Sequence, residues 1–263
     1  MLAALMRRIA GHPLVLDRLG AVGLRIRLER PERRNAIAIA TAAALADLLE
    51  QIALLTDIRL VVMAGAGDDF CSGVDLGDTS RDIRGNLETM ARLFAALAAL
   101  PQFSVALIRG VAFGAGIGLA SACDMAIATA DARFACPEVR HGLIPSIISP
   151  YIVAAIGRRA AIELFATGRA IDARRACDLG LVGLVVANPA ALAAAEAELV
   201  VAMARVAPGA AREAKALGTR SIGAALIAGT IARTEERMRS DEAREGLRAF
   251  RDRRQPAWIG DRA

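Results

Sequence analysis

The sequence is poor in several residue types that carry chemistry. Lys215 is the only lysine among 33 basic residues, and aromatic residues make up 3% of the 263 residues. A single lysine gives little support for a Schiff-base mechanism. The two histidines, His12 and His141, lack the close spacing of a zinc site, and a Ser-His-Asp triad would have to rest on one of them alone. The sequence therefore argues against these three kinds of site.

Cysteine is also scarce and scattered. The four cysteines, none of them in C-x-x-C spacing, are Cys71, Cys123, Cys136 and Cys177. We therefore expect thiols in the core, with neither disulfides nor a metal site. Long apolar runs are missing as well, because no charge-free stretch exceeds 17 residues and the run 141–157 contains Pro145 and Pro150. We expect no membrane span.

Apolar residues dominate what is present. The chain is 55% hydrophobic and 23% charged, with a formal net charge of +5. A chain of this length buries roughly three quarters of its unfolded surface, so it can fold as one large domain or two small ones without disulfides or metal. In segment 1–13 the arginines follow the short apolar run, the reverse of a secretory signal, and we expect a cytoplasmic protein.

Strand and helix patterns alternate through the first part of the chain. Alternating or β-branched runs predict strands at 21–29, 59–63, 104–110 and 123–129, and apolar residues at helical spacing predict helices at 41–55 and 84–99. This alternation is typical of an α/β core. From about residue 189 only helical patterns remain. We therefore expect an α/β core over residues 1–195 and a C-terminal helical region over residues 196–263.

Two segments have a composition that packing alone does not explain. DDFCSGVDL at 68–76 puts Ser72 and Gly73 in a turn after an apolar strand. In FGAGIGLASA at 113–122, small residues precede a helix that begins near Ala115 or Gly116. Free N–H groups at a helix N-terminus attract negative charge, and two amides aimed at one oxygen form an oxyanion hole. A purely structural turn and a dinucleotide site remain open, although the third glycine of G-x-G-x-x-G is missing.

A third segment, CPEVRHGLIPSIISPYI at 136–152, places Glu138 among mostly apolar residues. A carboxylate in such surroundings is either paired with an arginine, here Arg140, or adapted for proton transfer by a raised pKa. From the residues alone both readings stay open.

Taken together, these motifs resemble the enoyl-CoA hydratase/isomerase, or crotonase, superfamily. The resemblance rests on PERRNAI at 31–37, on the three segments above in their order, on LFATGRAIDARRACDLGLVGLVV at 164–186 and on EGLRAFRDRRQP at 245–256. It covers nearly the whole chain. It implies an α/β fold, a crotonase-like spiral of ββα units with a C-terminal helical trimerisation region, and a homotrimer or a dimer of trimers.

The resemblance also implies an acyl-CoA substrate, with coenzyme A as part of the thioester and no tightly bound cofactor. The catalytic groups carried over by position are the carboxylate of Glu138 and the backbone amides of Ser72 and Ala115, which would hold the thioester oxygen. The residues expected to border CoA or the acyl group are Arg34, Ala36, Ser72, Gly73, Val74, Asp75, Leu76, Gly116, Gly118, Phe250 and Arg253.

The chain departs from the family's two-glutamate pattern, because Gly118 stands where the other acid would be. A glycine there predicts extra space for a bulky, branched or carboxylated acyl group. The run from Glu138 onward resembles the subgroup that hydrates methylglutaconyl-CoA or isohexenylglutaconyl-CoA, where Arg140 or His141 could neutralise a second carboxylate. Hydration of a 2-enoyl-CoA is the first hypothesis, and isomerisation with Glu138 as the proton shuttle is the second.

A nucleic-acid-binding protein of the same fold is a third hypothesis, suggested by the net charge of +5. A basic balance equally suits a protein that binds the phosphates of CoA. One Trp and one Tyr leave few platforms for stacking bases, and no aromatic RNA-recognition motif is present. The sequence therefore argues against RNA binding as the main function.

Overall fold

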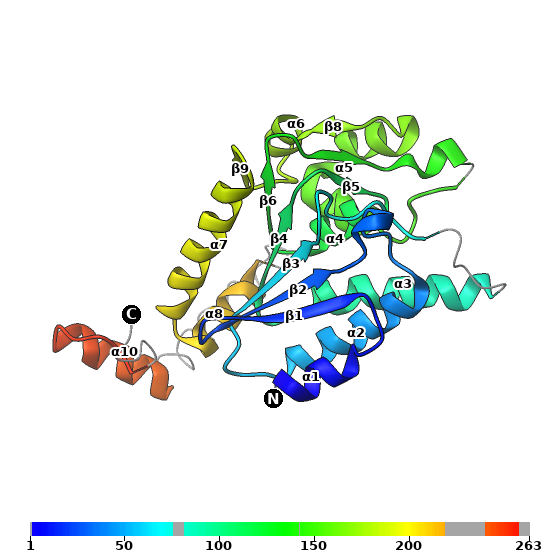
Figure 1. Ribbon diagram of the computed structural model, residues 1–263. Coiled ribbons are helices and arrows are strands. Elements are labelled where there is room, and N and C mark those ends of the chain that lie inside the picture. The colour runs from blue at the N-terminus through cyan, green and yellow to red at the C-terminus, as the bar shows by residue number, and fades with distance from the viewer. Residues whose placement is uncertain (1, 76–81, 142, 219–239, 258–263) are drawn as a thin grey trace, which may run out of the picture.

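The computed structural model describes residues 2–75, 82–141, 143–218 and 240–257. It has a central sheet with helices on both faces (Figure 1). Among the helices of the described residues, none is both long enough and apolar enough to cross a membrane. The elements in chain order are α1 (Leu2–Arg8), β1 (Leu14–Leu19), β2 (Gly23–Leu28), η1 (Pro31–Arg33), α2 (Ile39–Ala53), β3 (Leu60–Gly65), α3 (Ile83–Ala98), β4 (Phe103–Ile108), β5 (Val111–Phe113), α4 (Ala115–Ala122), β6 (Met125–Thr129), β7 (Arg133–Ala135), η2 (Pro137–His141), α5 (Ser149–Thr167), β8 (Ile171–Asp172), α6 (Ala173–Asp178), β9 (Leu184–Val186), α7 (Pro189–Ala204), α8 (Pro208–Leu217) and α10 (Asp241–Arg251).

Two sheets organise the strands. The larger has the order β1-β2-β3-β4-β6-β9, in which β1 runs antiparallel to β2 and the other neighbours are parallel. The smaller has the order β5-β7-β8, with β5 parallel to β7. Because parallel strands end at the same edge of a sheet, the segments that follow β3 and β4 begin side by side.

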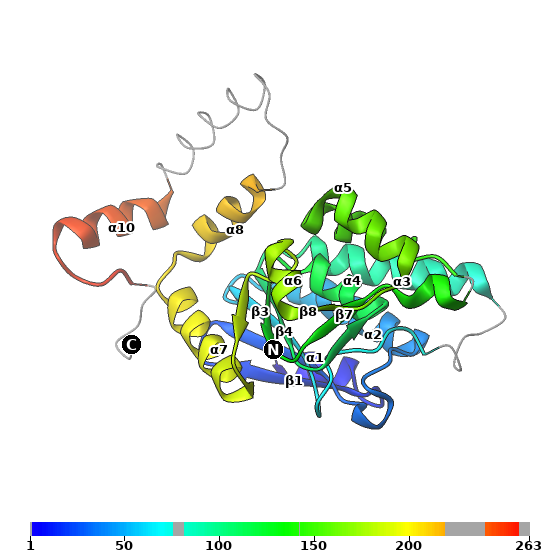
Figure 2. The same cartoon turned by 90° about the horizontal axis from the view of Figure 1, so that it is seen from above.

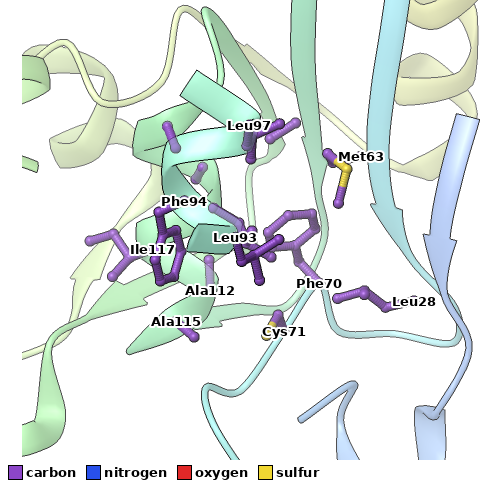
Figure 3. Close-up of a cluster of buried hydrophobic side chains, with 14 of the residues drawn as sticks. Leu28, Met63, Phe70, Cys71, Leu93, Phe94, Leu97, Ala112, Ala115 and Ile117 are labelled. Atoms are coloured by element: carbon purple, nitrogen blue, oxygen red, sulfur yellow. The ribbon is translucent and has the colours of Figure 1, made fainter. Parts of the chain in front are cut away.

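The core lies on both faces of the larger sheet. In β3, Val61 and Met63 belong to the cluster under α2, α3 and α4, part of which Figure 3 shows. Leu60 and Val62 face the other way and pack with Leu192 of α7. A parallel strand buried on both faces reads as an unbroken apolar run, which is why this strand is visible in the sequence.

Beyond β9 the regular elements of the described residues are all helices. Residue 195 lies inside α7, and Glu196 of the same helix pairs with Arg25 of β2 at 2.9 Å. The expected boundary at 195 therefore lies inside this helix, which packs on the core. The Nζ of Lys215 in α8 lies 2.5 Å from an Asp124 carboxylate oxygen. In contrast, α10 projects away from the sheet in both views (Figures 1 and 2).

All four cysteines are free thiols. Cys71 and Cys136 are buried, and Cys123 and Cys177 are partly buried. Burial raises the pKa of the Cys71 thiol to about 12. The expectation of core thiols is confirmed for Cys71 and Cys136.

Candidate active site

The turn between β5 and α4 presents a backbone N–H group. Gly114 has φ 52° and ψ −116°, a backbone conformation that strains residues with a side chain, and its N–H donates to the Ala135 carbonyl at 3.0 Å. Ala115 follows as the first residue of α4, where N–H groups have no acceptor within the helix. Within the described residues the Ala115 N–H donates to no protein acceptor.

The loop after β3 lies against this turn. Cys71 forms a parallel bridge with Ala112 of β5, and Val74 forms one with Ile37. A Cβ placed on Gly73 would lie 3.8 Å from the Ala115 nitrogen. The segments 68–76 and 113–122, both singled out in the sequence, therefore meet at the start of α4.

Ser72 does not offer its amide to this place. Its N–H donates to the Arg34 carbonyl at 2.9 Å, and its hydroxyl donates to the Arg33 carbonyl at 3.2 Å. Both groups thus point to the loop around η1. The structure therefore contradicts the expectation that the Ser72 N–H is an oxyanion donor, because that N–H already has an acceptor.

Val74 has the N–H that points toward α4. The Gly73 carbonyl accepts from the Ile37 N–H at 2.8 Å. In a trans peptide unit the carbonyl of one residue and the N–H of the next point in opposite directions, so the Val74 N–H points away from Ile37. On the side of this loop away from Ile37 lie β5 and Ala115. In the part of the chain that is described, the Val74 N–H has no protein acceptor.

Glu138 stands beside the same turn. It belongs to η2, its Oε2 is buried, and its Oε1 would lie 3.2 Å from a Cβ on Gly114. Burial, with a further contribution from the Glu138 charge, raises the pKa of the Cys136 thiol to about 12. The Arg140 side chain packs against Gly168 at the end of α5. A carboxylate and two N–H groups therefore surround Gly114.

Arg34 and Ala36, expected to border the CoA site, lie in the loop that follows η1, next to Ser72. Asn35, only 1% exposed, ties this loop to the one after β3 by donating to two of its carbonyls at 2.7 and 2.8 Å. Sequence reasoning missed Asn35. An asparagine after the two arginines of PERRNAI is nevertheless a signal, because asparagine tolerates the left-handed backbone (φ 55°) that it adopts here.

Two ion pairs border the same loops. Arg34 pairs with Asp69 at 2.7 Å, and Arg30 pairs with Asp75 at 2.7 Å. Burial opposes ionisation of Asp69, but hydrogen bonds from the Arg34 guanidinium and the Val111 N–H outweigh it and lower the pKa of Asp69. The Arg34 side chain stays 55% exposed, so its charge still faces solvent.

Gly116 and Gly118 let α4 pack closely against neighbouring segments. A Cβ on Gly116 would lie 2.2 Å from the Cys71 carbonyl oxygen. A Cβ on Gly118 would lie 2.4 Å from Ile148 Cγ2 and 2.9 Å from Phe94 Cε1. The space expected beside Gly118 is thus filled by these two side chains, and the expectation of a larger acyl pocket there is wrong.

Replacing Gly118 by alanine is expected to lower the free energy of unfolding by about 1–3 kcal/mol, the usual cost of overpacking a core. Denaturant unfolding measures the change. Gly218→Ala is the matched control, because the nearest atom to its Cβ lies at an ordinary 3.4 Å. Equal stability of Gly118→Ala and the wild type would mean that Ile148 and Phe94 move aside at no cost.

The remaining predicted residues lie elsewhere. Leu76 is outside the described residues. Phe250 belongs to α10 and Arg253 follows it, and Figures 1 and 2 place α10 on the far side of α7 and α8 from α4. Within one chain, the structure does not bring Phe250 and Arg253 to Gly114.

Comparisons with known proteins show which family the chain belongs to. The enoyl-CoA hydratase/isomerase family model matches residues 20–261. A putative enoyl-CoA hydratase of Thermus thermophilus is 34% identical over 243 residues, which cover 88% of this chain and 95% of the relative. The mitochondrial Delta(3,5)-Delta(2,4)-dienoyl-CoA isomerase of Rattus norvegicus is 34% identical over 179 residues, 62% of this chain and 55% of that protein.

Solved structures of this family have the same fold. The crystal structure of an enoyl-CoA hydratase/isomerase from Marinobacter aquaeolei matches with a TM-score of 0.89 and 30% identity, covering 94% of this chain and 99% of that one. The expected crotonase-like α/β fold is therefore confirmed. The chain belongs to the enoyl-CoA hydratase/isomerase family.

Proposed function

We propose that the protein adds water to a 2-enoyl-CoA and forms a 3-hydroxyacyl-CoA. The observation that carries the proposal is the place of the Glu138 carboxylate, whose Oε1 faces Gly114 next to the N-terminus of α4. The N–H groups of Val74 and Ala115 point to the same place. A proton-transfer group and two oxyanion donors are the parts that this reaction needs.

The two N–H groups act on the thioester oxygen. When water attacks the β-carbon, the electron pair of the double bond moves through the α-carbon and negative charge develops on that oxygen. Fixed N–H donors stabilise this enolate, each by about 3 kcal/mol in comparable oxyanion holes. The positive end of the α4 dipole adds to the effect at Ala115.

Glu138 moves the proton. As a carboxylate it accepts a proton from water while the water oxygen bonds to the β-carbon. It then returns a proton to the α-carbon, the thioester carbonyl re-forms, and the carboxylate is regenerated. One acid thus serves both steps, which fits a site where Ile148 and Phe94 fill the space beside Gly118.

Coenzyme A enters this reaction only as part of the substrate, and no tightly bound cofactor takes part. Arg30 and Arg34 stand on the loop beside Ser72, where cations attract the phosphates of CoA. Because α10 projects from the far side of the same chain, Phe250 and Arg253 reach a bound CoA only in a neighbouring subunit of a homotrimer or a dimer of trimers.

The full-length protein is expected to consume the conjugated-enoyl absorbance of crotonyl-CoA, with the 3-hydroxyacyl-CoA as the product identified by mass spectrometry. Absorbance is monitored over time with the free acid, crotonate, as the control. No loss of absorbance with any straight-chain 2-enoyl-CoA would contradict hydration.

Isomerisation is the second candidate, and two observations favour it. Only one carboxylate faces Gly114 in the described residues, and a relative of 34% identity is named a dienoyl-CoA isomerase. In that reaction Glu138 takes a proton from the α-carbon of a 3-enoyl-CoA and returns it to the γ-carbon, while the same N–H groups hold the enolate. A 3-enoyl-CoA substrate would then gain conjugated absorbance without uptake of water.

A further inference from the structure

The surroundings of the chain change from polar to apolar between Gly114 and the first turn of α4. Gly114 is the non-helical residue just before α4, and the Gly118 N–H donates to its carbonyl at 3.1 Å, so Gly118 lies one turn into the helix. A Cβ on Gly114 would face the Glu138 carboxylate, and a Cβ on Gly118 would face Ile148 and Phe94. Hydrocarbon therefore begins directly beyond the proposed reacting groups.

The two apolar side chains are fixed in place. Ile148 is 5% exposed and Phe94 is 1% exposed. The Phe94 ring lies 5.9 Å from the Tyr151 ring, and Figure 3 shows it against α4, close to Ile117. A packed core yields little to a ligand, because moving one side chain displaces its neighbours. Ile148 and Phe94 therefore form a rigid surface rather than a flexible one.

We infer that Ile148, held by Phe94, closes the end of the acyl-binding site and limits the size of the acyl group. This inference rests on the proposed function, which places the reacting carbons between Ala115 and Glu138. The acyl group that fits is short and apolar. A second carboxylate would meet hydrocarbon without a hydrogen-bond partner on this side, and burying such a charge is costly. Ile148 and Phe94 therefore do not favour the carboxylated, branched glutaconyl-CoA substrates that the sequence resemblance suggested.

Ile148→Ala tests the inference, with Ile152→Ala as the matched control. Both positions lie near the start of α5, Ile152 is 0% exposed, and each substitution removes the same three carbons from the core. Binding of butyryl-CoA and octanoyl-CoA is measured by calorimetry, which requires no turnover. Each extra buried methylene is worth roughly fourfold in affinity. We expect Ile148→Ala to raise the affinity for octanoyl-CoA relative to butyryl-CoA at least tenfold, and Ile152→Ala to leave this ratio within twofold.

An unchanged ratio in a folded Ile148→Ala variant overturns the inference, and so does an equal change in Ile152→Ala, which would indicate general loosening of the core. If Ile148→Ala does not fold, Phe94→Leu removes the ring atom Cε1 that would lie 2.9 Å from a Cβ on Gly118, and it is expected to raise the ratio two- to fourfold. A different result would contradict the proposed function itself. In that case the wild-type protein would bind acyl-CoA but would neither hydrate nor isomerise an enoyl-CoA.

Discussion

Replacing Glu138 by glutamine is expected to lower turnover of the enoyl-CoA substrate at least about a hundredfold, the usual scale on which a general acid or base is lost. Glutamine keeps the size of the side chain but cannot exchange a proton. Position 118, where the family's other acid would stand, is a glycine, so no acid there can take over the proton transfer. Steady-state kinetics measure the loss, and the affinity for butyryl-CoA should stay within about twofold.

Glu163→Gln is the control for this experiment, because Glu163 is an exposed residue of α5. Its turnover should equal that of the wild type. Turnover of Glu138→Gln within about fivefold of the wild type would move the proton-transfer role to another residue.

Val74→Pro is expected to lower turnover by about a hundredfold to a thousandfold, the cost of losing one oxyanion donor. Proline removes the N–H at this position. The bridge to Ile37 survives, because its hydrogen bonds use the Gly73 carbonyl and the Asp75 N–H. Steady-state kinetics measure turnover, and circular dichroism confirms that the variant is folded.

Two variants separate the backbone from the side chains. Val74→Ala and Ser72→Ala keep their N–H groups, and both should retain turnover within about fivefold of the wild type. If Val74→Ala loses as much activity as Val74→Pro, the side chain rather than the N–H is the working group. A large loss in Ser72→Ala would show that the Ser72 hydroxyl takes part in the reaction.

Helices α2 and α3 were predictable because their burial follows a simple period, whereas α5, with Pro150 at its start and a non-helical Gly157 inside it, was not predicted. In α3 the buried residues Met90, Leu93, Phe94 and Leu97 lie at helical spacing. In contrast, β5 and β7 have three residues each, too few to show a period. Their pairing with each other, rather than local preference, defines them as strands.

The chemical types in the site were predictable, but their exact donors were not. Glu138 was visible as an acid among apolar residues, and Ala115 as the start of a helix behind glycines. The choice between Ser72 and Val74 depends on Gly73, whose φ of 119° turns the Val74 N–H toward α4. The space beside Gly118 is filled by Ile148, which is thirty positions away in the chain, and no local sequence pattern predicts such a contact.

A crystal structure of the protein with butyryl-CoA, a saturated ligand that cannot react, tests the central claim most directly. We expect the thioester oxygen within about 3 Å of the Val74 and Ala115 nitrogens, the usual length of such hydrogen bonds. We also expect the Glu138 carboxylate to face the α- and β-carbons of the acyl chain. A thioester oxygen bound elsewhere, or a Glu138 carboxylate turned away from these carbons, would contradict it.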